Sequence, residues 1–468
     1  MGQGAAAFAA DVDRPGRSEV PMDRVWQALK EAVTRAVAGA GDAVTAMSLA
    51  VEGDVAVPVD RNGATLAPSI LPGDTRADAV ARDFQERVSP IEVMRVTGMP
   101  GGMGYPLLRL LWLKEHARDV YGDTYKFMGW QEYVAARLGL EPVTEATLAA
   151  RTQMYDVINR SWASGIIDEA GLDRDKLSDV RETGTVLGEI SRNAAAELGL
   201  PTGTKFVLGG HALAVSALGV GAASAGHAMD AVDGAEHLVC ASHEPALDVQ
   251  MMKNGFACWP HVVPDMYVSD AYNFTGANLL RWFARLVGAD TAGAVDLDRL
   301  TDAMDDAPTD LLVLPYFTIS GTPYLDPKPL GSVVGLTLET RRATLIRALL
   351  EGLAFEIRLN VVLLGESGVR VNDLHVAGPA ATSRAWCQLK CDVLGMPLHR
   401  HPDVQADVLG AAMLAGVGTG VYDDASAAVA FCVSAEDSLY PNGERTDLYA
   451  RKFLQYRRLY PALREIIP

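Results

Sequence analysis

Four side chains in the last third of the sequence have a spacing that suits a metal ion. Cys387 and Cys391 are four residues apart, and His399 and His401 follow within ten residues. Residues four apart share one face of a helix, so two thiolates and two imidazoles would make a tetrahedral ligand set. The same spacing is typical of small side chains on the buried face of a helix. We expect this second arrangement, and no metal site.

The segment at 207–219, VLGGHALAVSALG, is a second place where chemistry could occur. An apolar run, two glycines and a run of small residues predict a strand, a turn and a helix. Ligands bind at such turns in α/β proteins, although close packing of a helix on a strand gives the same pattern. His211 and Ala212 lie at the turn. The sequence lacks a G-x-x-x-x-G-K-[S/T] loop, and no G-x-G-x-x-G follows a strand.

Strand-like and helix-like segments alternate through most of the 468 residues, which predicts an α/β fold of two comparable lobes. We place the lobes at 1–237 and 238–468. The apolar periodicity predicts helices at 24–38, 105–116, 126–138, 341–364, 383–394 and 407–417, a strand at 373–376 and a turn at 60–63. These elements must position the residues described above.

A series of motifs, in the same order along the chain, resembles the FGGY carbohydrate kinases from about residue 15 to the end. The motifs are DRNG (60–63), PSILPGDTRA (68–77), YPLLRLLWLKEH (105–116), GGHAL (209–213), YNFTGAN (272–278), LPY (314–316), SGTPYLDP (320–327), RALLEG (347–352) and LGAA (409–412). The resemblance implies two ribonuclease-H-like (actin-like) lobes, with a sugar and ATP meeting in the cleft between them. It also implies an Asp as general base and Mg-ATP mostly on the second lobe.

The sequence departs from the family pattern at the groups for phosphoryl transfer. The family base is the Asp of a Gly-Gly-x-Asp turn, and that position here is Ala212. General-base catalysis is typically worth about 10²–10⁴-fold. The family's Gly-Thr-x-Glu phosphate loop is replaced at 233–236 by DGAE, where Asp233 precedes Gly234. A carboxylate at this place is expected to repel the phosphates of ATP.

The nucleotide-binding turn and the start of the first lobe depart from the pattern as well. The family's Gly-Gly-Gly-Ala turn becomes Gly378, Pro379, Ala380 and Ala381. Proline removes a backbone N–H, and the added Cβ atoms oppose close approach of a ligand. No Asp-x-Gly-Thr hairpin opens the chain, so we expect residues 4–12 to be the third strand of a first lobe that lacks its first two strands.

The absence of two strands would leave an unpaired sheet edge, and such edges recruit other chains. We therefore expect Met1–Val12, a second copy of the chain or a partner protein to cover this edge. A homo-oligomer is one form that such covering would take.

The sequence retains the acceptor side of the family pattern better than the nucleotide side. Those that lie where the resemblance puts the acceptor pocket are polar and can bond hydroxyl groups: Glu52, Asp74, Arg76, His211 and Asn273. An ion pair that closes a loop is the alternative for Asp74 with Arg76, and a turn cap is the alternative for Asn273. The candidates for acid–base chemistry in the former cleft are His211, Glu52, Asp74 and Glu236.

The composition excludes several classes of partner. The formal charge is −18, from 59 acidic and 41 basic residues, and no basic cluster would attract nucleic acid or a membrane surface. Five cysteines in so long a chain do not form a disulfide framework. The start has no signal-peptide pattern and no apolar run could span a bilayer, so we expect a cytoplasmic protein.

The main prediction is an FGGY-like protein that keeps a sugar- or polyol-type cleft but has lost its catalytic Asp and phosphate loops. It would be a pseudokinase, or an enzyme repurposed away from ATP-dependent phosphorylation, and it would need no cofactor. The alternative is an active ATP-dependent sugar kinase, a phosphotransferase with an alcohol acceptor. This enzyme would use ATP and Mg through displaced contacts. In both cases the ligand is a small sugar- or polyol-like molecule.

Overall fold

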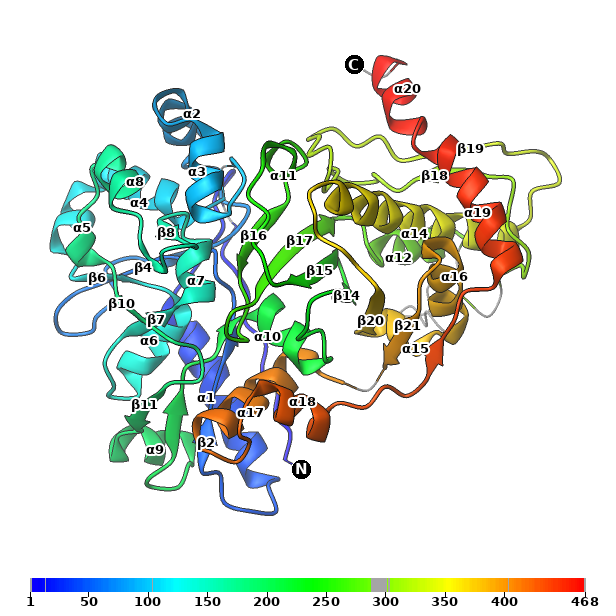
Figure 1. The fold of residues 1–468 in the computed structure, drawn as a ribbon. Coiled ribbons are helices and arrows are strands. Elements are labelled where there is room, and N and C mark those ends of the chain that lie inside the picture. The colour runs from blue at the N-terminus through cyan, green and yellow to red at the C-terminus, as the bar shows by residue number, and fades with distance from the viewer. Residues whose placement is uncertain are drawn as a thin grey trace. The chain divides into compact units, whose positions relative to one another are not determined.

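The computed structural model describes residues 2–12, 14–102, 104–287, 301, 304–402 and 404–466 (Figure 1). Contacts divide the chain into two compact units, each made of separate segments. Unit 1 is Met1–Ser216, Trp259–Asp265 and Asp407–Phe431, and unit 2 is Ala217–Cys258, Met266–Ala406 and Cys432–Pro468. Both units combine strands with helices, which confirms the predicted α/β class. The predicted lobes divided the chain once, after residue 237. The two units do not, because the segments 259–265 and 407–431 belong to unit 1.

Unit 1 contains many short strands. They are β1 (Glu19–Val20), β2 (Ala46–Met47), β3 (Ala50–Val51), β4 (Val57–Val59), β5 (Ser69–Ile70), β6 (Lys126–Met128), β7 (Val143–Glu145), β8 (Tyr155–Asp156), β9 (Ser161–Trp162), β10 (Asp179–Arg181), β11 (Val186–Glu189), β12 (Lys205–Val207) and β13 (Gly210–His211).

The helices of unit 1 surround these strands. They are α1 (Met22–Ala38), α2 (Asp78–Arg87), α3 (Pro90–Thr97), α4 (Pro106–His116), α5 (Arg118–Asp123), α6 (Trp130–Arg137), α7 (Ala146–Arg151), α8 (Ser164–Ala170), the 3-10 turn η1 (Arg174–Lys176), α9 (Arg192–Leu198), α10 (Ala212–Gly219), α17 (Ala406–Gly418) and α18 (Ala425–Cys432). The last residues of α10 and α18 and the first of α17 belong to unit 2.

Two parallel strand pairs place the candidate site of unit 1. Strand β2 pairs with β12, and β3, directly after β2, pairs with β13, directly after β12. Between the two pairs, a Cβ atom on Gly209 would lie 1.8 Å from the carbonyl oxygen of Leu49. Only glycine fits this close approach of two backbones, and its place in the GGH turn follows from that.

Helix α1 shows how the sequence pattern becomes packing. Val25 and Trp26 are buried, and Leu29, Val33 and Val37 pack against the same core cluster. These apolar residues recur every three or four positions, so they form one stripe of the helix. The predicted helix at 24–38 is thus confirmed, with its start two residues earlier at Met22.

Unit 2 is built on one seven-stranded sheet with the order β16-β17-β15-β14-β20-β21-β22. The described strands of unit 2 are β14 (His227–Val232), β15 (Glu236–Ser242), β16 (Ala257–Pro260), β17 (Tyr267–Asn273), β18 (Leu312–Leu314), β19 (Ser332–Val334), β20 (Asp373–Ala377), β21 (Leu398–His401) and β22 (Ser438–Leu439). Of these, β18 and β19 pair with each other in a separate two-stranded sheet. Strands β14, β20 and β21 run parallel, whereas β15 is antiparallel to β14 and β17, and β22 to β21. Strand β16 ends in unit 1.

The helices of unit 2 include one long, largely buried helix. They are α11 (Val249–Lys253), α12 (Asn278–Leu286), α14 (Arg342–Glu366), α15 (Pro379–Thr382), α16 (Arg384–Leu394), α19 (Gly443–Tyr456) and α20 (Leu459–Ile466). The predicted helices at 341–364, 383–394 and 407–417 and the strand at 373–376 are confirmed to within two residues at each end. Within the described part of the chain, no helix combines the length and the apolarity that a membrane crossing needs.

The single helix predicted at 126–138 is wrong. Lys126–Met128 form strand β6, which pairs antiparallel with β4, and Gly129 separates β6 from helix α6. Phe127 and Met128 are buried in this pairing. The apolar spacing of a three-residue strand next to a helix is compatible with one longer helix, so periodicity alone could not separate the two.

Residues 4–12 do not form the predicted strand. The backbone forms only an isolated bridge between Asp11 and Glu19. The segment is held to α1 instead, because Arg24 Nη1 donates to Ala9 O at 2.6 Å and Arg35 Nη1 donates to Ala5 O at 2.7 Å.

Within the described residues, β2 pairs only with β12, so residues 2–12 do not cover its other edge. Met1 of the predicted cover lies outside the described residues. A second copy or a partner protein at this edge remains a prediction.

Candidate functional site

The candidate site of unit 1 lies where β3 and β13 end. The two strands are parallel, and Val51 lies opposite His211. Glu52 follows β3 and Ala212 follows β13, so these residues leave the sheet side by side at the carboxyl ends of neighbouring strands. Ligands of α/β proteins bind at such ends. The structure therefore brings together Glu52 and His211, two of the residues expected in one acceptor pocket.

His211 is held in one orientation by backbone contacts. It is buried, its N–H donates to Thr147 Oγ1 at 2.7 Å, and its Nδ1 accepts from the N–H of Leu213 at 3.3 Å. A neutral imidazole whose Nδ1 accepts a hydrogen bond carries its proton on Nε2. The arrangement thus assigns Nε2 as a donor, which suits the binding of a ligand oxygen better than the removal of a proton.

Gly53 is a point of close approach in this site. A Cβ atom there would lie 2.6 Å from Cδ2 of His211 and 2.9 Å from Cγ of Arg151. Any other residue would displace one of these two side chains, so the EGD turn at 52–54 needs its glycine.

Arg151 and Asp54 form an ion pair beside this turn. Arg151 Nε donates to Asp54 Oδ1 at 3.0 Å and Nη2 to Asp54 Oδ2 at 2.5 Å, a two-pronged geometry that fixes both side chains. The guanidinium also lies 5.0 Å from the ring centre of Trp259 and 5.7 Å from that of Tyr105. His211 meets the Trp259 ring edge to face at 5.6 Å. The result is a rigid cationic and aromatic wall.

Glu52 is the most available carboxylate of the group. Its Oε1 accepts the N–H groups of Gly53 and Asp54 at 3.0 and 3.1 Å, whereas Oε2 has no partner among the described residues. The side chain is exposed by area, yet protein atoms surround the carboxylate closely. This desolvation, and next the charge of Asp54, raise the pKa of Glu52 above its ordinary value, against the opposing effect of Arg151. A raised pKa suits a general base near neutral pH.

Asp74 and Arg76 form a separate, closed cluster. The Asp74 carboxylate is buried, with Oδ2 accepting the N–H of Ser18 at 2.8 Å and both oxygens accepting from Arg76. Arg76 Nη2 also reaches Glu19 Oε2 at 2.5 Å. Burial alone would raise the pKa of Asp74, but these hydrogen bonds lower it. This is the geometry of an ion pair that closes a loop.

The turns selected in unit 2 lie next to each other. Strands β14 and β20 are parallel, and Ala231 lies opposite Ala377, so the turns at 233–234 and 378–380 follow from neighbouring strand ends. A Cβ atom on Gly378, whose φ is +78°, would lie 2.9 Å from the carbonyl oxygen of Val232. The two segments with altered family motifs therefore form one surface of unit 2.

The charge of Asp233 is partly balanced in the structure. Arg281 Nη2 lies 3.1 Å from Asp233 Oδ1, and Asn278 Nδ2 donates to Gly234 O at 3.0 Å. Both partners come from the first turn of α12. The positive charge of the Arg281 guanidinium reduces the repulsion of phosphates expected from Asp233. This ion pair was not predicted from the sequence.

Pro379 occupies the first position of α15 after Gly378. Proline is favoured there because its φ is already helical and its missing N–H would have no partner inside the helix. Ala380 follows in the same turn and is buried. The change from the family's Gly-Gly-Gly-Ala is thus compatible with the local fold.

Glu236 and Asn273 are buried in unit 2. Lys390 Nζ donates to Glu236 Oε1 at 2.5 Å and to Asp230 Oδ2, and all three side chains are fully buried. Burial and the charge of Asp230 raise the pKa of Glu236, in opposition to Lys390. Asn273 Oδ1 accepts the N–H of Thr275 at 3.0 Å, which is the turn cap given as the alternative to a pocket role.

Four residues of the unit 1 site were not selected from the sequence: Asp54, Tyr105, Arg151 and Trp259. Arg151 ends a short helix and Trp259 lies in a segment more than 100 residues further on. The sequence EGD at 52–54 could have indicated the ion pair, because two acidic residues so close together favour a cation nearby.

Comparisons with known proteins show the family. The model for the N-terminal domain of the FGGY family of carbohydrate kinases matches residues 1–219, and that for the C-terminal domain matches residues 233–419. Together they cover most of the chain, which therefore belongs to the FGGY family of carbohydrate kinases. Its fold is the two-lobed, ribonuclease-H-like (actin-like) fold of these proteins, as predicted.

Individual relatives agree with this assignment. The chain is 29% identical to an autoinducer-2 kinase of Enterobacter sp. (strain 638) over 95% of this chain and 86% of that protein. A xylulose kinase from Brucella ovis superimposes with a TM-score of 0.89 at 24% identity, over 100% of this chain and 95% of its own. A gluconate kinase from Lactobacillus acidophilus gives 0.87 at 23%, over 98% and 92%. This coverage gives no support to a first lobe without two strands.

Proposed function

We propose that this protein is an ATP-dependent kinase that phosphorylates a hydroxyl group of a small sugar-like molecule, and that Glu52 is its general base. The observation that carries the proposal is the strand register in unit 1. Because Val51 lies opposite His211, Glu52 leaves β3 beside Ala212, the position of the family's Asp. Neighbouring strands are about 4.8 Å apart, and a Glu side chain is long enough to reach across that spacing.

The groups around Glu52 support acceptor binding. His211 Nε2 is assigned as a donor, and Arg151, fixed by Asp54, places a positive charge beside the turn. Donors and a charged wall of this kind bind the oxygens of a polyhydroxylated molecule. The raised pKa of Glu52 makes its carboxylate a stronger base than an ordinary one.

The two turns of unit 2 support nucleotide binding. Asp233 is an exposed carboxylate, and Mg²⁺ is commonly held by one or two carboxylates together with the phosphates of a nucleotide. Asp233 would hold the ion in this way, and Arg281 beside it would contact a phosphate oxygen. The ion supplies charge stabilisation for phosphoryl transfer.

In the proposed reaction the acceptor hydroxyl oxygen attacks the γ-phosphorus of ATP. The Glu52 carboxylate takes the hydroxyl proton, and the bond from the γ-phosphorus to the bridging oxygen of ADP breaks. The products are the phosphate ester, ADP and a proton, which leaves Glu52 for solvent. Positioning and charge stabilisation supply the rest of the rate enhancement in such reactions.

The test is incubation with Mg-ATP and each of autoinducer-2, xylulose and gluconate, the molecules named in the relatives' activities. Phosphorus NMR and mass spectrometry would detect a phosphate ester formed in proportion to ADP. We expect ATP-dependent ester formation with at least one acceptor. Saturable acceptor binding without ester, at all pH values from 6 to 9, would overturn the proposal.

A second candidate function is favoured by Ala212, which cannot accept a proton. Under it, the protein binds a sugar-like ligand as a pseudokinase, or carries out a different reaction with it. Ala212→Asp separates the two candidates. Asp is favoured at the start of a helix, so the variant is expected to fold. Turnover that appears only in Ala212→Asp would support the second candidate, and turnover in the unmodified protein supports the first.

A further inference from the structure

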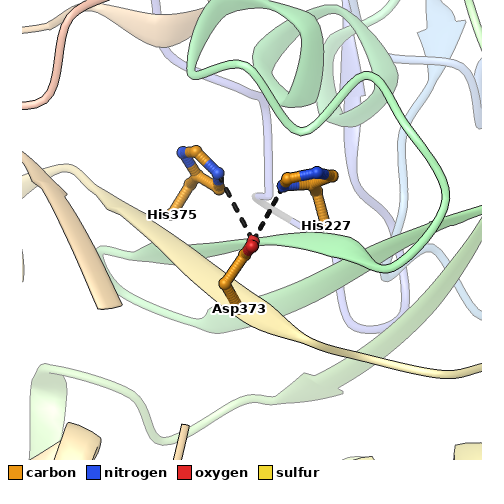
Figure 2. A group of neighbouring side chains, drawn as sticks. All are labelled: His227, Asp373 and His375. Carbon is orange, nitrogen blue, oxygen red and sulfur yellow. Dashed lines mark ion pairs between the residues drawn. The ribbon is translucent and has the colours of Figure 1, made fainter. Parts of the chain in front are cut away.

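Another group of polar side chains lies on unit 2, at the opposite ends of the strands that carry the nucleotide turns. His227 is the first residue of β14, Asp373 is the first residue of β20, and His375 is two positions further along β20. In the parallel register His227 lies opposite Asp373. All three side chains therefore project from one face of the sheet and turn toward one another, as Figure 2 shows.

Their donor atoms converge without forming hydrogen bonds. His227 Nδ1 lies 2.9 Å and His375 Nε2 lies 3.5 Å from Asp373 Oδ1, and the three atoms all lie within 4.8 Å of one another. Each of these three atoms is buried, and none has a hydrogen-bond partner among the described residues. Buried polar atoms are almost always hydrogen-bonded, whereas these three atoms make only the two ion pairs with one another within the described residues, an arrangement that requires an explanation.

The far side of His375 is occupied as expected for a metal ligand. Its Nδ1 lies 3.1 Å from Nε2 of His401. Two ring nitrogens at this distance share one proton, so His375 Nδ1–H can donate to His401 Nε2. Histidines that bind a metal through one nitrogen usually donate the other N–H to a fixed acceptor, which sets the tautomer.

We propose that His227, Asp373 and His375 bind a divalent first-row transition-metal ion, with zinc as the expected ion. Two imidazole nitrogens and one carboxylate oxygen form a donor set that zinc prefers, with bonds of about 2.0–2.2 Å to each. Ligand atoms around such an ion are roughly 3.3 Å apart in a tetrahedron, and the two contacts at 2.9 and 3.5 Å bracket this value. Solvent takes the fourth position.

The surroundings support an exchangeable ion with solvent access. The side chains of His227, Asp373 and His375 are 38%, 18% and 13% exposed, so the cluster lies near the surface although its three donor atoms are buried. The site is also distinct from the nucleotide turns, which begin past the pair Ala231 and Ala377, four residues further along the same strands. At about 3.3 Å per residue this is roughly 13 Å.

The two cysteines of the sequence analysis are not part of this site. Cys387 Sγ donates to Ala380 O and Cys391 Sγ to Met396 O, and both thiols have pKa values raised to about 12, mainly by burial. A metal needs the thiolate, which such burial disfavours. The two cysteines pack as apolar side chains. The proposed site therefore contains no sulfur ligand, unlike the set of two cysteines and two histidines considered from the sequence.

The test uses the full chain without a histidine tag. After treatment with a chelator and its removal, zinc is titrated against a chromophoric competitor, and bound zinc is quantified by mass spectrometry. We expect one zinc per chain and a rise of several degrees in the melting temperature with zinc. The cobalt-substituted protein should show the visible bands of a four-coordinate ion and no sulfur-to-cobalt charge-transfer band.

Three variants make the test specific. Asp373→Asn keeps the shape of the side chain and should weaken zinc binding by at least 100-fold, and His227→Gln should do the same. His243→Gln, at an exposed histidine elsewhere in unit 2, should bind zinc as the unmodified protein does. Circular dichroism and zinc-free melting temperatures check that each variant folds. Sub-stoichiometric zinc in the unmodified protein, or equal affinity in folded Asp373→Asn, would overturn the proposal.

Discussion

Lys390 in unit 2 and Arg151 in unit 1 are both cations held by acidic side chains, but their surroundings differ. Lys390 lies between Asp230 and Glu236, and all three side chains are fully buried. Arg151 is paired with Asp54 and both are partly exposed, and Glu52 beside them keeps one carboxylate oxygen without a partner among the described residues. The first cluster is closed to ligands, whereas the second remains open.

The contrast shows that a perturbed pKa does not identify a functional group without accessibility. Glu236 and Glu52 both have raised pKa values, and burial is the largest cause for each. Only Glu52 can meet a ligand. We therefore assign Glu236, first selected as an acid–base candidate, to the interior of unit 2, and retain Glu52 for the proposed chemistry.

The largest expected effect comes from Glu52→Gln. Loss of the base should lower kcat/KM for phosphoryl transfer by about 10²–10⁴-fold with little change in stability. In the unmodified protein kcat/KM should fall as the pH is lowered through the raised pKa of Glu52, since the base must be ionised. Glu52→Gln should not show this decrease on the acidic side of the pH profile. The exposed Glu86→Gln is the control. Equal rates in Glu52→Gln and Glu86→Gln would reassign the base.

Lys390→Met should affect stability instead of chemistry. The substitution leaves Asp230 and Glu236 buried without a cation, which should lower the free energy of unfolding by about 3–5 kcal/mol. Urea denaturation measures the change, and Lys253→Met, at an exposed position on α11, should change it by less than about 0.5 kcal/mol. If Lys390→Met were as stable as Lys253→Met, the closed cluster would have no structural role.

Arg151→Lys tests the open cluster at constant charge. Lysine cannot form the two-pronged contact with Asp54 or the same stacking on Trp259. We expect KM for the acceptor to rise about tenfold while kcat changes less, because Arg151 positions the turn and does not take the proton. Steady-state kinetics at fixed Mg-ATP separates the two constants. A fall in kcat alone would place Arg151 at the reacting atoms.

The smallest effect concerns Glu132, a buried carboxyl group of unit 1 with its pKa raised to about 7 by burial. The folded state holds this proton more tightly than the unfolded chain does. The contribution of Glu132 to the free energy of unfolding is therefore fully present below about pH 4.3 and is lost as the pH rises toward 7. Glu132→Gln should remove roughly 1–2 kcal/mol of this decline between pH 5 and pH 8. Urea midpoints at both pH values, with the exposed Glu189→Gln as control, measure it.

The sequence predicted the α/β class, most of the long elements and the family, because these depend on local periodicity and on motifs within short segments. It did not predict the contact of Arg151 with Asp54, which lie 97 residues apart, or the placement of Trp259 against His211. It considered the histidines at 399 and 401 with two cysteines, whereas strand register groups His375 with His227 and Asp373. Register is set by pairing between distant strands and has no signature in one strand alone.

Unit 1 is made of three separate segments of the chain, so it cannot fold completely until the last of them has been synthesised. Ser216 ends its first segment, but its last segment reaches Phe431, roughly 200 residues later. At translation rates of about 5–20 residues per second, the ribosome needs roughly 10–40 s to bridge that interval. Until then helices α17 and α18 are missing and Val215, which packs against Gly410, has no neighbour there. We therefore expect nascent unit 1 to expose this surface until most of the chain has emerged.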